Sequence, residues 1–430
     1  MGVSLNIQNI TIKTYNFRNL MKEIIPKMDC FTHGIHQYTA KLIPHIPRYF
    51  VEKYSKANET ILDFFCGSGT TLLEARLSGR NAVGIDINPL AALISEVKTT
   101  LLDIDELSSA IWAVKENIKN DNRKINVNFP NIDYWFCKKA QDELFKIKFG
   151  IGRVKGRFNE SIYKFLLVCF SSIIRKSSYA DLRIAKTYKS KRVIEKIENG
   201  WTPTPIKYFE DAIDKNVERI KSLSEHLNEN NNYVKIFQGD ARETSNILKH
   251  HGIRKADFVI TSPPYINAQD YFRSYKLELW WLGLATPEEV RLLNKQTIGT
   301  ENLPKTDYNS IPGSEDKLLN AILHKIWKIN KKKSYIIYNY FENMETVIKE
   351  IYKVLKINGY FCLVTGINTI CGVQIPTYRI LTHIAEANGF KLLEIGKDKI
   401  KNRALPPIRN HNGGIIKEEW ITVSQKVVSK

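Results

Sequence analysis

The sequence predicts an α/β fold with a mainly parallel central sheet and a basic helical insertion. Short apolar runs of strand length alternate with helical periodicity in the first hundred residues and again after residue 230. One of these runs leads through a Gly-x-Gly turn into a helix, the pattern of a βα unit that binds a ligand at its turn. A helix-prone stretch rich in Lys and Arg separates the two α/β parts.

The charge balance of the chain indicates a polyanionic partner. The 430 residues carry 64 Lys and Arg against 45 Asp and Glu, a formal net charge of +19. Hydrophobic residues at 43% and charged residues at 25% are ordinary values for a globular protein, so the composition does not explain the excess. The charge favours nucleic acid as the partner. A general bias toward Lys-rich, soluble sequence is the alternative.

Cysteine usage and apolar content argue against other classes of protein. The six cysteines form no C-x-x-C pair and no metal-ligand spacing, which predicts free thiols, a reducing compartment and no metal. His33 and His36 lack a third ligand and are interpreted as polar loop residues. The longest apolar run, Phe165 to Phe170, is too short to span a bilayer, and no signal peptide is visible. We expect a cytoplasmic protein with no membrane partner.

The glycine turn follows a predicted strand over residues 60–65. Gly67 and Gly69 permit a tight turn and close approach of a ligand to the backbone. The N–H groups at the start of the following helix then face that ligand. Leu72 stands where a dinucleotide fingerprint has its third glycine, so a nicotinamide or flavin cofactor fits poorly.

A second predicted strand, residues 81–85, ends in an acidic residue. Asp86 lies about 20 residues after the glycine turn, the spacing at which an acid accepts hydrogen bonds from ribose hydroxyls. The alternative is that Asp86 caps the helix that starts near Pro89. We favour the ribose role because the glycine turn stands at the matching distance.

The most informative turn follows the predicted strand at residues 256–260. Thr261-Ser262-Pro263-Pro264-Tyr265 cannot continue a ladder, because proline has no N–H and a fixed φ. The chain must therefore turn stiffly at the carboxyl end of the strand, the edge where open α/β sheets bind ligands. The turn presents a hydroxyl, a free carbonyl and an aromatic ring, which suit a flat amine on a heteroaromatic ring.

The basic insertion covers residues 101–229. Its most basic part, residues 146–192, holds thirteen Lys and Arg against Glu160 and Asp181, with aromatics interleaved. Such a surface can follow a phosphate backbone, so the insertion is interpreted as a DNA-contacting lobe that carries target recognition. A solvated helical cap on the sheet is the alternative. The candidate DNA-binding residues are Lys155, Arg157, Arg175, Lys176 and Arg183, with Tyr271 and Arg273 beside the proline turn.

Three motifs resemble the DNA amino-methyltransferases. Ser262–Tyr265 is similar to their catalytic motif, and the serine form is most typical of the cytosine-N4 enzymes. Residues 63–71 resemble their cofactor motif, which usually has Pro where this chain has Phe64. Residues 84–89 resemble the segment that carries the ribose acid. The resemblance covers residues 30–100 and 230–275 by motif and 345–425 by pattern only.

The resemblance implies a Rossmann-like methyltransferase fold and transfer of a methyl group from S-adenosylmethionine to the exocyclic amine of a flipped base. Double-stranded DNA and a cognate restriction endonuclease are the implied partners. The implied catalytic residues are Ser262, Pro263, Pro264 and Tyr265. The implied cofactor-binding residues are Tyr38, Asp63, Phe65, Gly67, Gly69, Thr70, Asp86, Ile87, Asp240 and Thr261. For Asp240, a capping role is the alternative.

Other functions remain open from the sequence. Adenine-N6 transfer competes with cytosine-N4 transfer, because both bases offer an amine beside a ring nitrogen. RNA is an alternative substrate, and a non-catalytic DNA-binding module is the alternative from a different class. Cytosine-C5 transfer is disfavoured, because no cysteine follows a proline as that chemistry requires.

The predicted organisation has three parts. Residues 1–28 form an N-terminal arm, residues 29–100 and 230–430 the catalytic domain, and residues 101–229 the inserted lobe. A helix is expected from about His33 to Tyr54, and a second from Val347 until Gly359 ends it. We expect polar loops at residues 285–330 and a DNA-contacting loop at residues 403–414.

Overall fold

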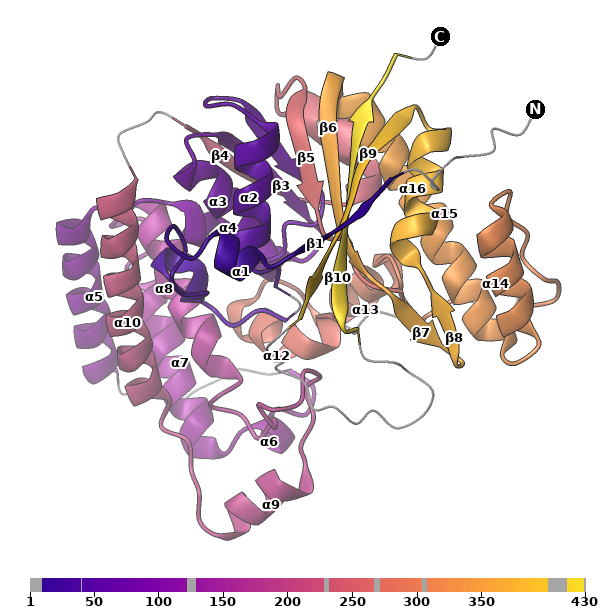
Figure 1. Ribbon diagram of the computed structural model, residues 1–430. Helices are drawn as coiled ribbons and strands as arrows, with labels where there is room; N and C mark the ends of the chain where they lie inside the picture. The colour runs from indigo at the N-terminus through magenta and orange to yellow at the C-terminus, as the bar shows by residue number, and fades with distance from the viewer. Residues whose placement is uncertain are drawn as a thin grey trace.

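The computed structural model describes residues 10–39, 41–121, 129–227, 232–266, 271–303, 308–400 and 416–428. In these residues an eight-stranded sheet forms the centre of the molecule, with helices on both faces (Figure 1). From one edge to the other, the strands are β1 (Ile12–Tyr15), β9 (Phe390–Lys399), β10 (Glu418–Lys426), β6 (Leu355–Gly366), β5 (Ala256–Thr261), β2 (Thr60–Asp63), β3 (Asn81–Asp86) and β4 (Val234–Gln238). All neighbours are parallel except the two pairs that β10 makes. The predicted Rossmann-like α/β fold is confirmed.

The central strands are apolar on both sides, as parallel strands covered by two layers of helices are. In β5, Phe258 and Ile260 face the cluster that contains α2 (His45–Tyr54) and α3 (Thr70–Leu77). Val259, between them, faces the opposite helix layer. That layer comprises α11 (Thr244–His250), α14 (Lys317–Trp327), α15 (Lys331–Val354) and α16 (Thr377–Ala387).

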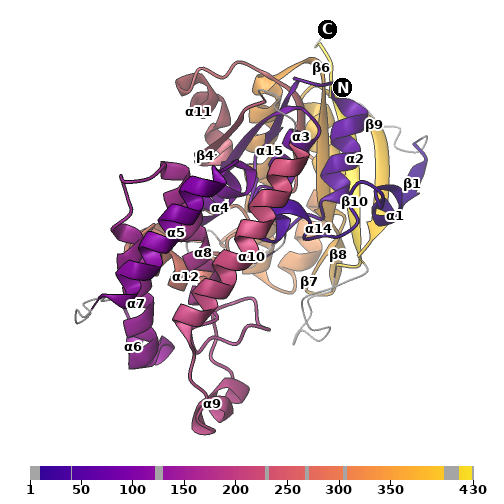
Figure 2. The same cartoon turned by 90° about the vertical axis from the view of Figure 1, so that its left-hand side faces the viewer.

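The inserted residues fold into helices, as predicted, and lie to one side of the sheet (Figures 1 and 2). The helices are α5 (Ile104–Lys119), α6 (Ile132–Trp135), α7 (Lys138–Gly152), α8 (Glu160–Ile174), α9 (Lys191–Glu198) and α10 (Pro205–His226). Their apolar core also contains Ile94 of α4 (Pro89–Thr99) and Trp281 of α12 (Tyr271–Leu282). The lobe is therefore packed onto two helices of the sheet domain through one continuous core.

The prediction of an N-terminal arm over residues 1–28 is partly wrong, because residues 12–15 belong to the sheet. Ile12–Tyr15 pairs in parallel with β9 as the edge strand β1, and the short helix α1 (Phe17–Leu20) follows. Tyr15 stacks on Phe17 with ring centroids 4.7 Å apart. The strand has no alternating burial pattern, and its contacts are the pairing with β9 and the aromatic packing of Tyr15.

The predicted loop region at residues 285–330 contains two helices. The first, α13 (Pro287–Gln296), begins at a capping box in which Thr286 and Glu289 each bond the other's backbone N–H. The second, α14, is capped by Asp316, whose side chain accepts from the Leu319 N–H at 2.7 Å. Both cap signals are present in the sequence, but the prolines and glycines around them obscured the helical periodicity.

Two predicted helix boundaries are also wrong. Phe31–Gly34 forms only a short 3-10 helix, η2, and α2 begins at His45, directly after Pro44. Proline lacks the N–H that an interior helical position needs, so the helix can start there but cannot cross it. Near the other end of the chain, α15 stops at Val354, and β6 has already begun at Leu355.

The remaining elements are small. The 3-10 helix η3 (Ala241–Glu243) follows β4, and the hairpin β7 (Asn368–Ile370) and β8 (Val373–Ile375) follows β6. The predicted loop at residues 403–414 lies outside the described residues. Among the helices that the structure describes, none has the length and apolar character needed to cross a membrane.

Candidate active site

The glycine turn and the proline turn lie side by side. They follow β2 and β5, which are hydrogen-bonded neighbours with Ile61 opposite Phe258 and Leu62 opposite Val259. The strand order reverses between these two strands, since β3 and β4 continue on one side and β6 on the other. Ligands of open α/β sheets bind at such a switch point, outside the carboxyl ends of the strands.

A buried hydrogen-bond network joins the two turns. The Thr261 hydroxyl donates to Asp63 Oδ1 at 2.6 Å, and the Phe65 N–H donates to the same carboxylate oxygen at 3.1 Å. Burial raises the pKa of Asp63, and the Thr261 bond opposes that rise. Asp63 and Thr261 were predicted to bind the cofactor. In the structure they bond each other, and the N–H of half-buried Phe65 donates to both side chains.

The glycine turn is shaped by positive φ angles and by Asp86. Gly67 and Gly69 have φ of +52° and +77°, and a Cβ on Gly69 would lie 2.8 Å from the Ser95 hydroxyl. The Asp86 carboxylate accepts from the Gly67 N–H at 2.9 Å, while Asn88 supplies the cap of α4. The alternative capping role of Asp86 is therefore taken by Asn88. Burial raises the pKa of Asp86 to about 6.

One polar atom of the turn has no partner in the described part of the chain. Thr70 is the first residue of α3, and its buried hydroxyl makes no hydrogen bond there. A buried hydroxyl usually has a partner, so an unpaired one at a helix N-terminus indicates a place for a ligand acceptor. The carboxylate of an amino acid is such an acceptor.

Aromatic residues form a wall over the glycine turn. The rings of Tyr38 and Tyr275 stack with their centroids 4.9 Å apart and an angle of 4° between their planes. The Tyr38 hydroxyl accepts from Asn88 Nδ2 at 3.3 Å, and its ring lies 3.5 Å from where a Cβ on Gly67 would stand. Burial raises the pKa of the Tyr271 hydroxyl on α12, and neighbouring Tyr275 and Asp86 add to the rise.

The proline turn combines buried and accessible groups. Pro263 is buried, whereas Ser262, Pro264 and Tyr265 are half-buried. Burial raises the pKa of the Tyr265 hydroxyl, and the charge of Glu419 at the start of β10 adds to the rise. Tyr265 therefore stays a neutral phenol.

Two further cofactor candidates lie beside these turns. Ile87 is half-buried and packs with Tyr38 against the core of the lobe. Asp240 accepts from the Arg242 N–H at 2.9 Å as the N-cap of η3, and it forms an ion pair with the Arg242 guanidinium at 2.5 Å. The capping role left open by the sequence is thus present, and the cofactor role of Asp240 stays a prediction.

A buried polar cluster beneath the glycine turn was missed in the sequence. Lys98 is fully buried and donates to the Ser68 hydroxyl at 3.1 Å, and burial lowers its pKa well below the usual range. His33 and Glu74, also fully buried, form a 2.6 Å contact. A helical spacing of four from Leu90 through Ile94 to Lys98 was the signal for the buried lysine.

The structure separates the DNA-binding candidates into two kinds. Lys155, Arg157, Lys176 and Arg273 are exposed. Arg183 is exposed but forms an ion pair with Asp181 at 3.0 Å. The Arg175 guanidinium instead points inward and donates to backbone carbonyls of residues 181–186. The prediction that Arg175 contacts DNA is therefore corrected: its guanidinium holds the loop at residues 181–186, because it donates its hydrogen bonds within the lobe.

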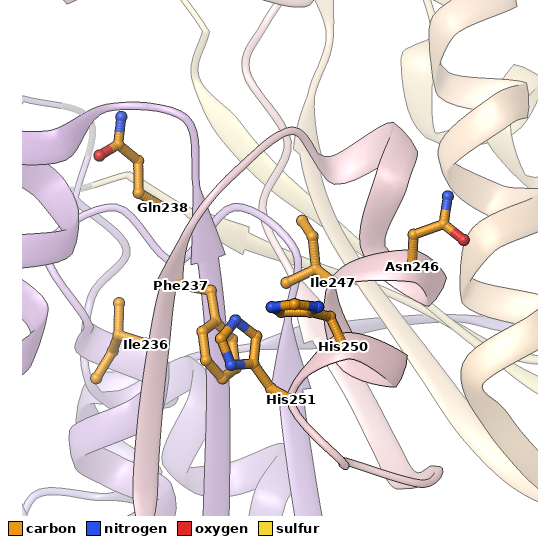
Figure 3. Close-up of a pocket in the computed structure, with 7 residues that line it drawn as sticks. All are labelled: Ile236, Phe237, Gln238, Asn246, Ile247, His250 and His251. Atoms are coloured by element: carbon orange, nitrogen blue, oxygen red, sulfur yellow. The ribbon is translucent and has the colours of Figure 1, made fainter.

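A depression of about 430 Å³ lies elsewhere on the molecule, on the edge strand β4 (Figure 3). It is lined by Ile236, Phe237, Gln238, Asn246, Ile247, His250 and His251. Phe237 and His251 stack there with centroids 4.2 Å apart. No residue of the glycine turn or of the proline turn lines it, so we do not assign it to the active site.

The topology and the site together define the class of protein. A mainly parallel sheet with one antiparallel strand, a glycine turn, an acid after the next strand and a proline turn across the switch point are the features of an S-adenosylmethionine-dependent methyltransferase. The orphan Thr70 hydroxyl, the glycine turn and the half-buried Asp86 fit the amino-acid and ribose parts of that cofactor.

Comparison with known proteins narrows the class. Residues 12–96 match a family model described as DNA methylase. Type II methyltransferase M.MvaI of Kocuria varians is 26% identical over 92% of this chain and 90% of its own length. Type II methyltransferase M.BsoBI of Geobacillus stearothermophilus is 26% identical over 84% of this chain and 79% of its own length. These matches confirm the resemblance of this chain to the S-adenosylmethionine-dependent DNA amino-methyltransferases.

Solved structures add little to this assignment. A methyltransferase from Methanosarcina mazei, described as S-adenosylmethionine-dependent, matches 88% of this chain and 98% of its own. The sequence identity is 10% and the TM-score 0.32. A match at this TM-score carries no inference about the site or the substrate.

Proposed function

We propose that the protein transfers a methyl group to the exocyclic N4 amine of a cytosine that has been flipped out of double-stranded DNA. The observation that carries the proposal is the Ser262–Tyr265 turn at the end of β5, directly across the switch point from the glycine turn. The serine at its first position favours cytosine N4 over adenine N6. The half-buried Ser262 and Tyr265 are consistent with a site that a base can enter.

The chemistry of the turn follows from its atoms. The amine of cytosine is a poor nucleophile, because its lone pair is delocalised into the ring. Acceptance of its two N–H bonds by Ser262 Oγ and the Pro263 carbonyl allows the nitrogen to pyramidalise and its lone pair to face the methyl donor. The cofactor supplies a methyl group bound to a sulfonium. Tyr265 stacks on the flipped base, and no covalent intermediate is needed.

The basic lobe supports DNA as the substrate. Its exposed cations, among them Lys155, Arg157 and Lys176, can neutralise phosphates without regard to sequence. Half-buried Tyr271 and exposed Arg273 lie on α12, the helix that follows the proline turn in the chain and packs into the core of the lobe. We assign the lobe, residues 101–229, to DNA contact and target recognition.

The biological setting we propose is a restriction-modification system. Both relatives described above are named type II methyltransferases, and this chain aligns with most of their length. The protein would then act in the cytoplasm and protect the DNA sites that a cognate restriction endonuclease cleaves. No membrane partner is involved.

The test is to incubate the protein with labelled S-adenosylmethionine and mixed genomic DNA, digest the DNA, and identify the modified nucleoside by mass. N4-methylcytosine is the expected product. N6-methyladenine would overturn the choice of base, although the family would stand. Label in RNA, but not in DNA, would overturn the choice of nucleic acid.

A further inference from the structure

One part of the lobe projects from the rest of the molecule. We call residues 181–201 the arm; it comprises a loop, residues 181–190, then α9, and ends at Trp201. In two views related by a quarter turn, α9 stands at the far end of the lobe, beyond α7 and α10 (Figures 1 and 2). Val193 is the only buried residue of α9. A helix this exposed gains little stability from packing, so its position needs another explanation.

The loop of the arm is built around Arg175. The Arg175 guanidinium donates to the Ala185 carbonyl at 2.9 Å and to the Asp181 and Lys186 carbonyls at 3.3 Å. It also donates to the Ile184 carbonyl. A single half-buried guanidinium therefore binds four carbonyls of the loop, those of residues 181, 184, 185 and 186.

Asp181 closes the same loop from its two ends. The Asp181 N–H donates to the Tyr188 carbonyl at 2.8 Å, and its carboxylate accepts from the Ser190 hydroxyl at 2.6 Å. Ser190 is also the N-cap of α9. The side-chain hydrogen bond from Arg183 keeps the pKa of Asp181 well below its usual range, so the carboxylate stays charged. The loop is thus fixed in shape before it meets any partner.

The surface of this fixed loop and helix is both cationic and apolar. The exposed cations are Arg183, Lys186, Lys191, Arg192 and Lys196, against exposed Glu195 and Glu198. Leu182, Tyr188 and Ile194 are 58%, 52% and 40% exposed. A duplex offers matching chemistry, because phosphates flank each groove and thymine methyl groups line the major groove. A solvated helical face would explain the cations but not the exposed apolar side chains.

The arm is attached to the helix that borders the active site. The buried Thr187 hydroxyl donates to the Ser274 carbonyl of α12 at 3.1 Å. One residue further along that helix, Tyr275 stacks on Tyr38 of the aromatic wall. The arm and the cofactor side of the active site therefore share one helix, and their separation is set by covalent geometry and one buried hydrogen bond.

We propose that the arm is the element that reads the target sequence: it enters a groove of the duplex and sets which base lies opposite the proline turn. This inference rests on the proposed function, since it requires a DNA substrate. The cations hold the backbone, Leu182 and Tyr188 face the bases, and the Thr187–Ser274 hydrogen bond fixes the register between the groove and the active site.

The first test removes the cations of α9. The triple variant Lys191→Gln, Arg192→Gln, Lys196→Gln is compared with Lys249→Gln, Arg254→Gln, Lys255→Gln, which removes three exposed cations from α11 and the loop before β5, at the amino edge of the sheet. Affinity for a short fluorescent duplex is measured over a range of salt. The slope of log K against log salt should fall by about 2 to 3 for the arm variant and stay near the wild-type value for the control. Equal loss in both variants, or in neither, would overturn the proposal.

The second test addresses sequence reading. The double variant Leu182→Ser, Tyr188→Ser keeps the charge of the arm. Sequencing of the methylated positions in genomic DNA should show a relaxed site, while affinity for a random duplex stays near that of the wild type. An unchanged site in this variant would contradict base reading by the arm.

The outcomes distinguish the arm from the function on which it rests. Wild-type protein that binds S-adenosylmethionine by calorimetry but methylates no DNA would contradict the proposed function. Wild-type protein that methylates DNA, with an arm variant that performs like the control, would contradict only the arm. Cofactor binding by each variant reports that it is folded.

Discussion

At the scale of single residues, the polar side chains of the site are of two kinds. Some are hydrogen-bonded to another residue of the chain, and one has no hydrogen-bond partner among the described residues. Asp63 and Thr261 satisfy each other, while the Thr70 hydroxyl has no partner among the described residues. The two sequence motifs that contain these residues, at 63–71 and 261–265, do not distinguish their roles. In the structure the first two join the turns, and the cofactor role of Thr70 stays a prediction.

The pair between the two turns predicts a stability effect. Thr261→Val removes a 2.6 Å bond and leaves the buried Asp63 carboxylate with one donor fewer, which should cost about 1–3 kcal/mol in the free energy of unfolding. Thr365→Val is the matched control, because the buried Thr365 hydroxyl has no partner in the described residues. Urea unfolding measures both. A control as unstable as Thr261→Val would show that the loss is general to buried threonines.

For Thr70 we expect the opposite: its replacement should affect cofactor binding and leave stability unchanged. Thr70→Val removes a hydroxyl that bonds nothing in the described residues, so the free energy of unfolding should stay the same or rise slightly. Affinity for S-adenosylmethionine should fall about tenfold, the worth of one hydrogen bond of about 1.4 kcal/mol. Calorimetry and thermal unfolding test this together. Unchanged affinity would mean that the hydroxyl does not face the cofactor.

At the scale of elements, α12 connects the active site with the lobe. Tyr275 of this helix stacks on Tyr38, Ser274 accepts from the arm, and Trp281 is buried in the core of the lobe. Shared packing of this kind cannot be predicted from a local pattern, because it depends on which elements meet.

Glu278 on the inner side of α12 predicts a pH dependence of stability. It is buried, and burial raises its pKa from 4.5 to about 7. Between these values the folded chain holds a proton that the unfolded chain has released, so the contribution to stability falls as pH rises from about 4.5 and levels off above about 7. Glu278→Gln should remove up to about 3 kcal/mol of this fall.

Thermal and urea unfolding of Glu278→Gln at pH 5 and pH 8 check this prediction. The exposed Glu288→Gln is the control, since its carboxylate is solvated in both states. The gain in stability relative to wild type should be larger at pH 8 than at pH 5. An equal difference at both pH values would mean that Glu278 is ionised throughout.

At the scale of the whole molecule, the sequence predicted the sheet and both turns because each rests on local chemistry. Gly67 and Gly69 require positive φ, and Pro263 and Pro264 end a ladder wherever they occur. The strand order then follows from the connections between successive βα units. The sequence placed the proline turn at the carboxyl edge of the sheet, and the pairing of β2 with β5 in the structure brings the glycine turn beside it.

Other features depend on contacts between distant segments and escaped prediction. The edge strand β1 pairs with residues 395–398, almost four hundred positions away. The helical spacing places Lys98 on the buried face of α4, but its hydrogen bonds with Ser68 and Thr32 come from segments that the local pattern does not identify. Arg175 was expected on the DNA surface, because a charge count does not tell an inward guanidinium from an outward one.

The central claim is that Ser262 acts on the amine during methyl transfer and takes no part in cofactor binding. The most direct measurement compares Ser262→Ala with wild type, using calorimetry for S-adenosylmethionine and label incorporation for genomic DNA. We predict unchanged cofactor affinity and a fall in the transfer rate of about 10²–10³-fold, the loss expected when one hydrogen bond of the transition state is removed. Transfer at the wild-type rate would contradict the account.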